Sequence, residues 1–189
     1  MQILASVHSG AVAGDFESIS TVTVGAGGQA TITFSSIPST YKHLQVRAIS
    51  RTNRGTFGID SILFRVNNDA GSNYSKHALY GDGSSATSIN DLSSTGFDIS
   101  ACTSTTVPTT TVGVMVVDIL DYTNTNKYKT IRVLGGVDLN GTIGGVGGRI
   151  SLLSGNWRNS SAISTITMTP IYGTTFVQHS QFALYGIRG

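Results

Sequence analysis

The sequence is poor in cysteine and in charged residues, and both shortages narrow the classes of protein to consider. Only one of the 189 residues is cysteine, Cys102, so no disulfide can form within the chain. Stability therefore does not depend on an oxidising compartment. Charged residues make up 12% of the sequence and the formal net charge is +2, without the dense basic patch that nucleic-acid binding requires. We expect no nucleic-acid partner.

Long apolar runs are also lacking. No segment approaches the roughly 18 apolar residues of a membrane-spanning helix, so no membrane span is expected. Residues 1–14 have neither a basic segment nor a sustained apolar core, which argues against a secretory signal peptide. The sequence thus predicts a protein that is made and folded in a cytoplasm.

Motifs for catalysis or cofactor binding are missing as well. The four histidines stand in separate segments without metal-site spacing, and no GxSxG nucleophile elbow occurs. Residues 25–30, GAGGQA, match the GxGxxA dinucleotide pattern, but the strand-like residues that follow offer no helix N-terminus for a pyrophosphate. We therefore expect no cofactor, no metal and no enzymatic activity.

The sequence instead favours valine, isoleucine, threonine, serine and glycine, the composition of strands and tight turns. Short alternating runs are separated by turn residues, and no run has convincing helical spacing. About ten strands at spacings of roughly 8 to 15 residues must close or stack to bury their faces. The sequence predicts an all-β fold: a single antiparallel, jelly-roll-like β-sandwich over residues 18–189, preceded by an extended N-terminal arm, residues 1–17.

The most apolar strand, residues 112–120, begins a hairpin that is expected to organise the fold. A turn at 123–126 and an alternating strand at 128–133 follow. On the first strand, Asp118 shares a face with four apolar residues, Val112, Val114, Val116 and Leu120. An unpaired carboxylate on a buried face costs several kcal/mol. Asp118 is therefore predicted to be a buried structural acid, held by backbone amides or an arginine.

Two groups of residues are candidate interfaces. The arm either frays or orders against a partner, and its apolar residues would make the contact: Ile3, Leu4, Val7 and Phe16. The only local concentration of positive charge consists of Arg47, Arg51 and Arg54. This cluster is either a solvated face or a surface that meets an acidic neighbouring subunit.

Trp157, followed by Arg158 and Asn159, is the candidate for glycan contact. An exposed aromatic ring can stack on the apolar face of a sugar while neighbouring polar side chains hydrogen-bond its hydroxyls. The alternative is a tryptophan in the core, since this side chain buries a large area.

Several phrases of the sequence carry a family resemblance when taken together. They are SSIPSTYKHLQVR at 35–47, SNYSKH at 72–77, GDGSS at 81–85, DILDYTNTNKYKT at 118–130, W-x-N-x-S-A-I at 157–163 and FALYGI at 182–187. In this combination the chain resembles a family of structural proteins of tailed bacteriophages, abundant in aquatic phages. The resemblance covers residues of about 18 to 189 and leaves the arm outside.

The resemblance implies a component of the virion that contacts other virion proteins and self-associates, as a trimer or about another local symmetry axis. Two roles are open: a capsid decoration or cement protein, and a tail-fibre or knob protein that recognises host glycan. Tail fibres more often carry a repetitive or coiled-coil shaft, and the sequence has no heptad repeat, which favours the shell.

Overall fold

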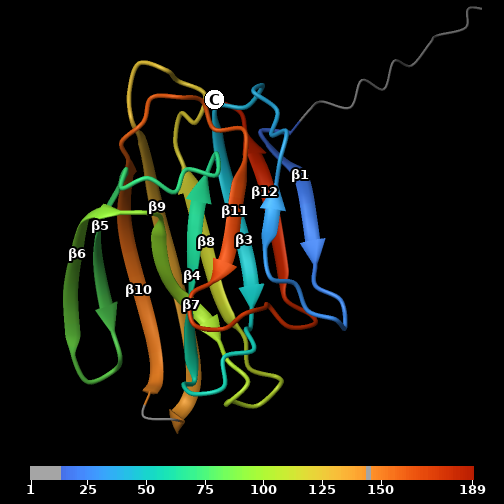
Figure 1. The fold of residues 1–189 in the computed structure, drawn as a ribbon, viewed down its shortest axis with the longest axis vertical. Coiled ribbons are helices and arrows are strands. Elements are labelled where there is room, and N and C mark those ends of the chain that lie inside the picture. Colours follow the sequence, from blue (N-terminus) through green and yellow to red (C-terminus); the bar gives the residue numbers. More distant parts are fainter. Residues whose placement is uncertain (1–13, 144–145) are drawn as a thin grey trace, which may run out of the picture.

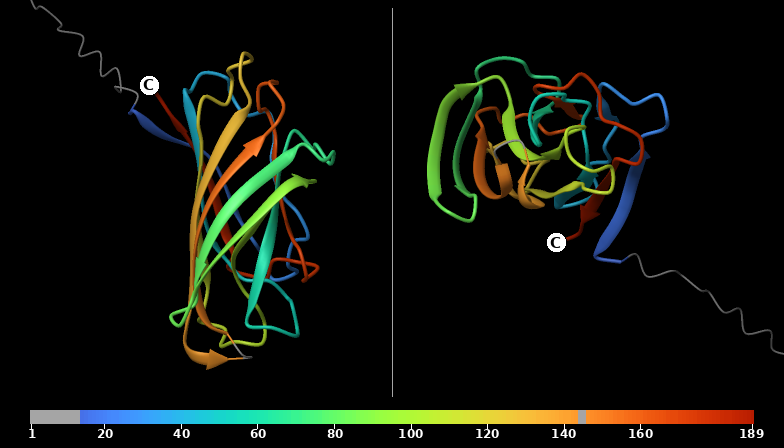
Figure 2. Two further views of the ribbon diagram at one scale, coloured as in Figure 1. Left: turned by 90° about the vertical axis from the view of Figure 1, so that its left-hand side faces the viewer. Right: turned by 90° about the horizontal axis from the view of Figure 1, so that it is seen from below.

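The computed structural model describes residues 14–143 and 146–189 of the chain. Within them, twelve strands form two stacked antiparallel sheets (Figure 1 and Figure 2). The large sheet has the order β1 (Phe16–Thr23), β12 (Gln181–Ile187), β3 (His43–Ser50), β8 (Gly113–Ile119), β9 (Lys129–Ile143), β10 (Val146–Trp157), β5 (Tyr74–Gly81) and β6 (Ala86–Ser94). The small sheet has the order β2 (Ile32–Phe34), β11 (Ile166–Pro170), β4 (Ile59–Val66) and β7 (Phe97–Thr103). The predicted all-β sandwich is confirmed.

The strands pair in a nested way. β5 pairs with β6, β4 with β7 and β3 with β8, and outside these β2 pairs with β11 and β1 with β12. Nested strands that alternate between two sheets give the jelly-roll-like arrangement. The β9–β10 hairpin is inserted between β8 and β5 and widens the large sheet. The β5–β6 hairpin therefore lies at one side of the molecule, at the far left of Figure 1.

The structure has more strands than the roughly ten expected from the sequence. The difference includes β6, residues 86–94, whose sequence carries no strand pattern. None of the nine residues of β6 is buried, so the strand lacks the apolar alternation by which a half-buried strand is recognised.

The core lies between the sheets and contains the aromatic side chains of both. Trp157, Tyr74 and Phe97 are all at most 1% exposed, and the rings of Tyr74 and Phe97 meet edge to face with centroids 5.0 Å apart. Gly155 of β10 lies directly over the Phe97 ring, which leaves no room for a Cβ atom. The large sheet thus packs closely on the small one at this point.

The N-terminal boundary differs from the prediction by two residues. β1 begins at Phe16, so residues 16 and 17 belong to the sheet and not to an arm. The Phe16 ring stacks on Tyr185, with centroids 4.7 Å apart, and the guanidinium of Arg47 lies over both rings. The other three arm residues, Ile3, Leu4 and Val7, lie outside the described residues.

The prediction that Asp118 is a buried acid is wrong. The buried face of β8 carries Gly113, Met115, Val117 and Ile119, and Asp118 lies on the other face with its side chain 23% exposed. It accepts a hydrogen bond of 2.7 Å from Gln45 and lies 3.4 Å from a guanidinium nitrogen of Arg132. The error arises because both faces of β8 are apolar, so alternation could not show which face is buried.

Candidate binding surfaces

The outer face of the large sheet carries a continuous group of aliphatic side chains. The pairing register places Val116, Leu134, Leu152 and Leu79 directly opposite one another across β8, β9, β10 and β5. The next row contains Ile49, Val114, Gly136 and Ile150. With Val112 these residues form what we call the apolar face: Ile49, Leu79, Val112, Val114, Val116, Leu134, Ile150 and Leu152.

Side chains on the apolar face are exposed to an unusual degree. Leu134 is 54% exposed, Ile150 62% and Leu79 52%. Single exposed aliphatic residues are ordinary on protein surfaces, but a contiguous group of this size is typical of an interaction surface.

The apolar face is uneven. Gly136 stands between Val114 and Ile150, and a shallow hollow of about 750 Å³ lies around it. The far side of the hollow is lined by Asp82, Asp138 and Arg149. Leu134, two residues away on the same strand and 54% exposed, lies at the edge of this hollow. The apolar face therefore presents a projecting side chain next to a hollow.

Hydrogen-bonded polar residues border the apolar face. Gln45 donates to Asp118 and accepts a 2.7 Å hydrogen bond from Nε of Arg47, and Arg132 approaches Asp118 from β9. An apolar centre with a polar rim is the usual composition of a protein–protein interface.

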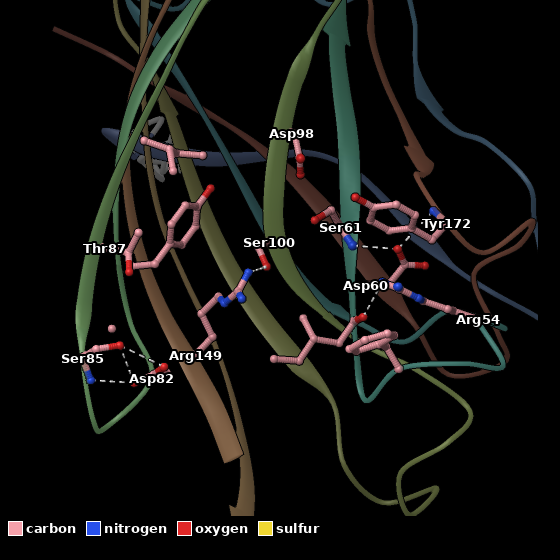
Figure 3. A pocket seen from close by; sticks show the side chains of 15 residues that line it. Arg54, Asp60, Ser61, Asp82, Ser85, Thr87, Asp98, Ser100, Arg149 and Tyr172 are labelled. Carbon is pink, nitrogen blue, oxygen red and sulfur yellow. Dashed lines mark hydrogen bonds between the residues drawn. The ribbon is translucent and has the colours of Figure 1, made fainter. Parts of the chain in front are cut away.

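A second surface is a polar cleft of about 440 Å³ between the β5–β6 hairpin and the outward side of the small sheet (Figure 3). Tyr80 and Thr87 come from the hairpin and Arg149 comes from β10. Strand β7 contributes Asp98 and Ser100 between the two sides. The β5–β6 hairpin also contributes Gly81, Asp82, Ser85 and Ile89. The remaining wall comes from β4 and the neighbouring loops: Arg54, Phe57, Ile59, Asp60, Ser61 and Tyr172.

Asp60 fixes the loop side of the cleft. It is only 1% exposed, and its carboxylate accepts hydrogen bonds from the Thr52 hydroxyl at 2.7 Å and from the backbone amides of Ser61, Tyr172 and Gly173. Asp60 is thus the kind of buried structural acid that the sequence analysis assigned to Asp118. Because it binds two consecutive amides of the β11–β12 loop, it also determines where Tyr172 lies.

The opposite side of the cleft is tied to β7. Lys76 donates to the Asp98 carbonyl at 3.1 Å, and Arg149 donates to the Ser100 hydroxyl at 2.9 Å. The guanidinium of Arg149 also lies over the Tyr80 ring, 5.2 Å from its centroid. Burial, together with the negative charge of Asp98, raises the pKa of Tyr80. Tyr80 therefore keeps its proton at neutral pH and can donate a hydrogen bond.

The predicted arginine cluster does not form one surface. Arg47 lies on the outer face of β3, and Arg54 stacks between Phe57 and Tyr172 in the cleft, 4.9 and 4.1 Å from their ring centroids.

Arg51 is 6% exposed, and its guanidinium donates to the carbonyls of Val107 and Pro108 at 2.8 and 2.5 Å. Burial lowers the pKa of Arg51. Strand β3 ends at Ser50, so Arg51 and Arg54 do not follow the alternation that would place them on the same face as Arg47.

Trp157 is a core residue and cannot be an exposed platform for sugar. Its side chain is 1% exposed, and its indole N–H donates to Asp69 at 2.7 Å. Arg158 is occupied as well, since its guanidinium donates to the carbonyls of Leu92 and Ser72. Asn159 accepts a bond from the Ser161 amide within its own turn. These three residues hold the loops around Trp157 and do not form a glycan site.

Within the described residues, no group of three or more metal-ligating side chains is placed to hold a metal ion, and no helix is long and apolar enough to cross a membrane. Comparison of the chain with family models, with curated proteins and with solved structures finds no match.

Proposed function

We propose that the chain is a structural protein of a tailed-bacteriophage particle, a capsid decoration protein that acts through contacts between proteins and carries out no chemistry. The observation that carries this proposal is the apolar face, because an aliphatic surface of this extent needs a protein partner. The resemblance of residues 18–189 to phage structural proteins supports the same role.

The partner on the apolar face is a second copy of the chain. The face has both a projection at Leu134 and a hollow at Gly136, so two copies related by a twofold axis can each insert Leu134 into the hollow of the other. Such a face-to-face contact closes as a dimer and does not lead to the trimer that the resemblance suggested.

The apolar face together with its polar rim is large enough for a stable dimer. Each residue on one side of a sheet covers about 33 Å², given a strand spacing of about 4.8 Å and about 6.8 Å between residues on the same side. The eight residues of the apolar face therefore cover about 260 Å². Four rows across the strands from β12 to β5, which include the polar rim, cover about 800 Å², the usual contribution of each partner to a stable interface.

Attachment to the shell is assigned to residues 1–13, with Ile3, Leu4 and Val7 as the contact residues. β1, which follows this segment, is an edge strand of the large sheet. The segment therefore joins the fold at an edge and not at the centre of the apolar face.

Quantitative mass spectrometry of purified particles of the phage that encodes the chain tests the proposal. A decoration protein should be present in hundreds of copies per particle, since it repeats with the shell subunits. A chain lacking residues 1–13 should remain folded and dimeric but should not bind particles that lack the protein. Absence from the particle would overturn the proposal, and so would about a dozen copies, as expected of a tail component.

The alternative role, a tail protein that recognises host glycan, loses the site on which it was based, because Trp157 is buried. That role would require another glycan site, and because a saccharide site would not by itself distinguish a tail protein from a decoration protein, copy number decides between them.

A further inference from the structure

We propose that the polar cleft between the β5–β6 hairpin and β7 is a binding site for a neutral saccharide. The cleft shares Gly81, Asp82 and Arg149 with the hollow of the apolar face, but its other lining residues lie away from that face. Its assignment does not depend on whether the protein belongs to the capsid or to the tail. A volume of about 440 Å³ lies within the usual range of ligand pockets and suits one or two sugar rings.

The charge of the cleft favours a neutral ligand. Its walls contain two arginines and three aspartates, so the opposite charges nearly balance. Two of the carboxylates are already satisfied: Asp60 by its four donors, and Asp82 by the amides of Ser84 and Ser85. An anion would meet the carboxylates and a cation would meet the guanidinium groups, so neither is favoured by the field of the site.

The groups that remain free are suited to hydroxyl ligands. The third carboxylate, that of Asp98, belongs to a side chain that is 39% exposed; its Oδ2 lies 3.9 Å from Nζ of Lys76, and its Oδ1 has no hydrogen-bond partner among the described residues. The exposed part of this carboxylate can accept a hydrogen bond from a ligand hydroxyl. The hydroxyls of Tyr80, Ser100 and Thr87 line the same space and can donate or accept. Adjacent sugar hydroxyls, which also do both, match this arrangement.

Aromatic rings provide the apolar part of the site. Tyr172 is 62% exposed and Phe57 is 48% exposed at the mouth of the cleft, where a C–H face of a sugar ring can stack. Arg54 packs against both rings and donates to the Ile59 carbonyl at 2.9 Å, so the rings are held in place. Wholly apolar ligands are disfavoured because they would leave the polar walls unpaired.

The site is formed before any ligand binds. Asp60 holds the loop of Tyr172, and Lys76 and Arg149 hold β7 against the large sheet. A ligand therefore does not have to order these elements, which lowers the free-energy cost of binding.

Two neighbouring residues of β6 offer a matched pair of variants. Thr87 lines the cleft, whereas Ser88 lies on the opposite side of the strand, opposite Leu79 of the outer face. Both are exposed, so neither substitution should prevent folding. Thr87→Trp should fill the cleft, and Ser88→Trp should leave it open.

Saturation-transfer difference NMR on the full chain provides the test, with cellobiose, N,N′-diacetylchitobiose and methyl α-L-rhamnoside as neutral probes. Glucuronate and glucose 1-phosphate serve as anionic probes. We expect at least one neutral probe to bind, to be weakened at least tenfold by Thr87→Trp and by Asp98→Asn, and to be unaffected by Ser88→Trp. Absence of binding by every neutral probe would overturn the assignment, as would binding that persists in Thr87→Trp or binding of the anionic probes alone. The dimer contact can fail its own test without changing any of these outcomes.

Discussion

The apolar face and the polar cleft are built from adjacent residues of the same strands, yet they are suited to different partners. Ile150 and Leu79 belong to the apolar face, and their neighbours Arg149 and Tyr80 line the cleft. On the apolar face nothing in the described structure covers the aliphatic side chains, so its binding energy comes from removing them from water. In the cleft most polar groups are already bonded, and binding depends on hydrogen bonds to those that are left. One sheet can thus offer a partner surface on one side and a ligand site on the other.

The largest expected effect concerns the core that supports both surfaces. Trp157→Ala should lower the free energy of unfolding by about 4 kcal/mol, because a fully buried ring is lost and a cavity remains. Loss of its bond to Asp69 adds to the effect. Urea denaturation followed by circular dichroism would measure the change. A loss below about 1 kcal/mol would mean that the two sheets do not depend on this ring.

A smaller loss of stability, caused by a change at Asp60, should affect the cleft and leave the apolar face intact. Asp60→Ala should cost about 3 kcal/mol, because four donors lose their shared acceptor in a buried place. The loop of Tyr172 should become mobile, while dimer formation through the apolar face should persist. Hydrogen exchange of the Tyr172 and Gly173 amides would show the first effect and sedimentation the second. Loss of the dimer in this variant would link the two surfaces and contradict their independence.

Alkaline pH should weaken the core beneath both surfaces. Burial raises the pKa of Tyr74 to about 12. In the unfolded chain the pKa of tyrosine is about 10, so the folded state holds this proton more tightly. The corresponding stability is therefore complete below pH 10 and is lost as the pH rises towards 12. Urea titrations at increasing pH should show this decline, with a shallower decline in Tyr74→Phe. Equal slopes in the two proteins would show that Tyr74 does not contribute.

The smallest effect is expected at the polar rim. Asp118→Ala should change the free energy of unfolding by no more than about 0.5 kcal/mol, since its contacts to Gln45 and Arg132 are partly exposed. The comparison with Asp60→Ala in the same denaturation series provides the control. A loss of about 3 kcal/mol at Asp118 would instead place this carboxylate in a buried pair.

The fold could be predicted from the sequence because most strands have one buried and one solvated face. β3 and β5 alternate in this way, with Leu44 and Val46 or Tyr74 and Ala78 directed to the core. The prediction failed where alternation carries no information. β8 is apolar on both faces and β6 is exposed on both, so the orientation of the first and the existence of the second had to come from the structure.

The binding surfaces were less accessible to sequence reasoning, since both depend on the pairing of distant strands. Leu79, Val116 and Leu134 are ordinary strand residues in the sequence, and only the register places them side by side. Asp60 and Asp98 stand in apolar strands and have no local motif. The signal available for the apolar face was the apolar character of both faces of residues 112–120.

The most direct measurement is the molecular mass of the free protein in solution. By sedimentation equilibrium at micromolar concentrations, the native chain should be a dimer, and Leu134→Lys should be a monomer with an unchanged secondary structure. Tyr128→Lys is the matched control, because Tyr128 is also 54% exposed but lies in the turn before β9, and this variant should remain dimeric. A native chain that is monomeric, or a Leu134→Lys variant that is as dimeric as the native chain, would contradict the assignment of the apolar face as the contact between two copies.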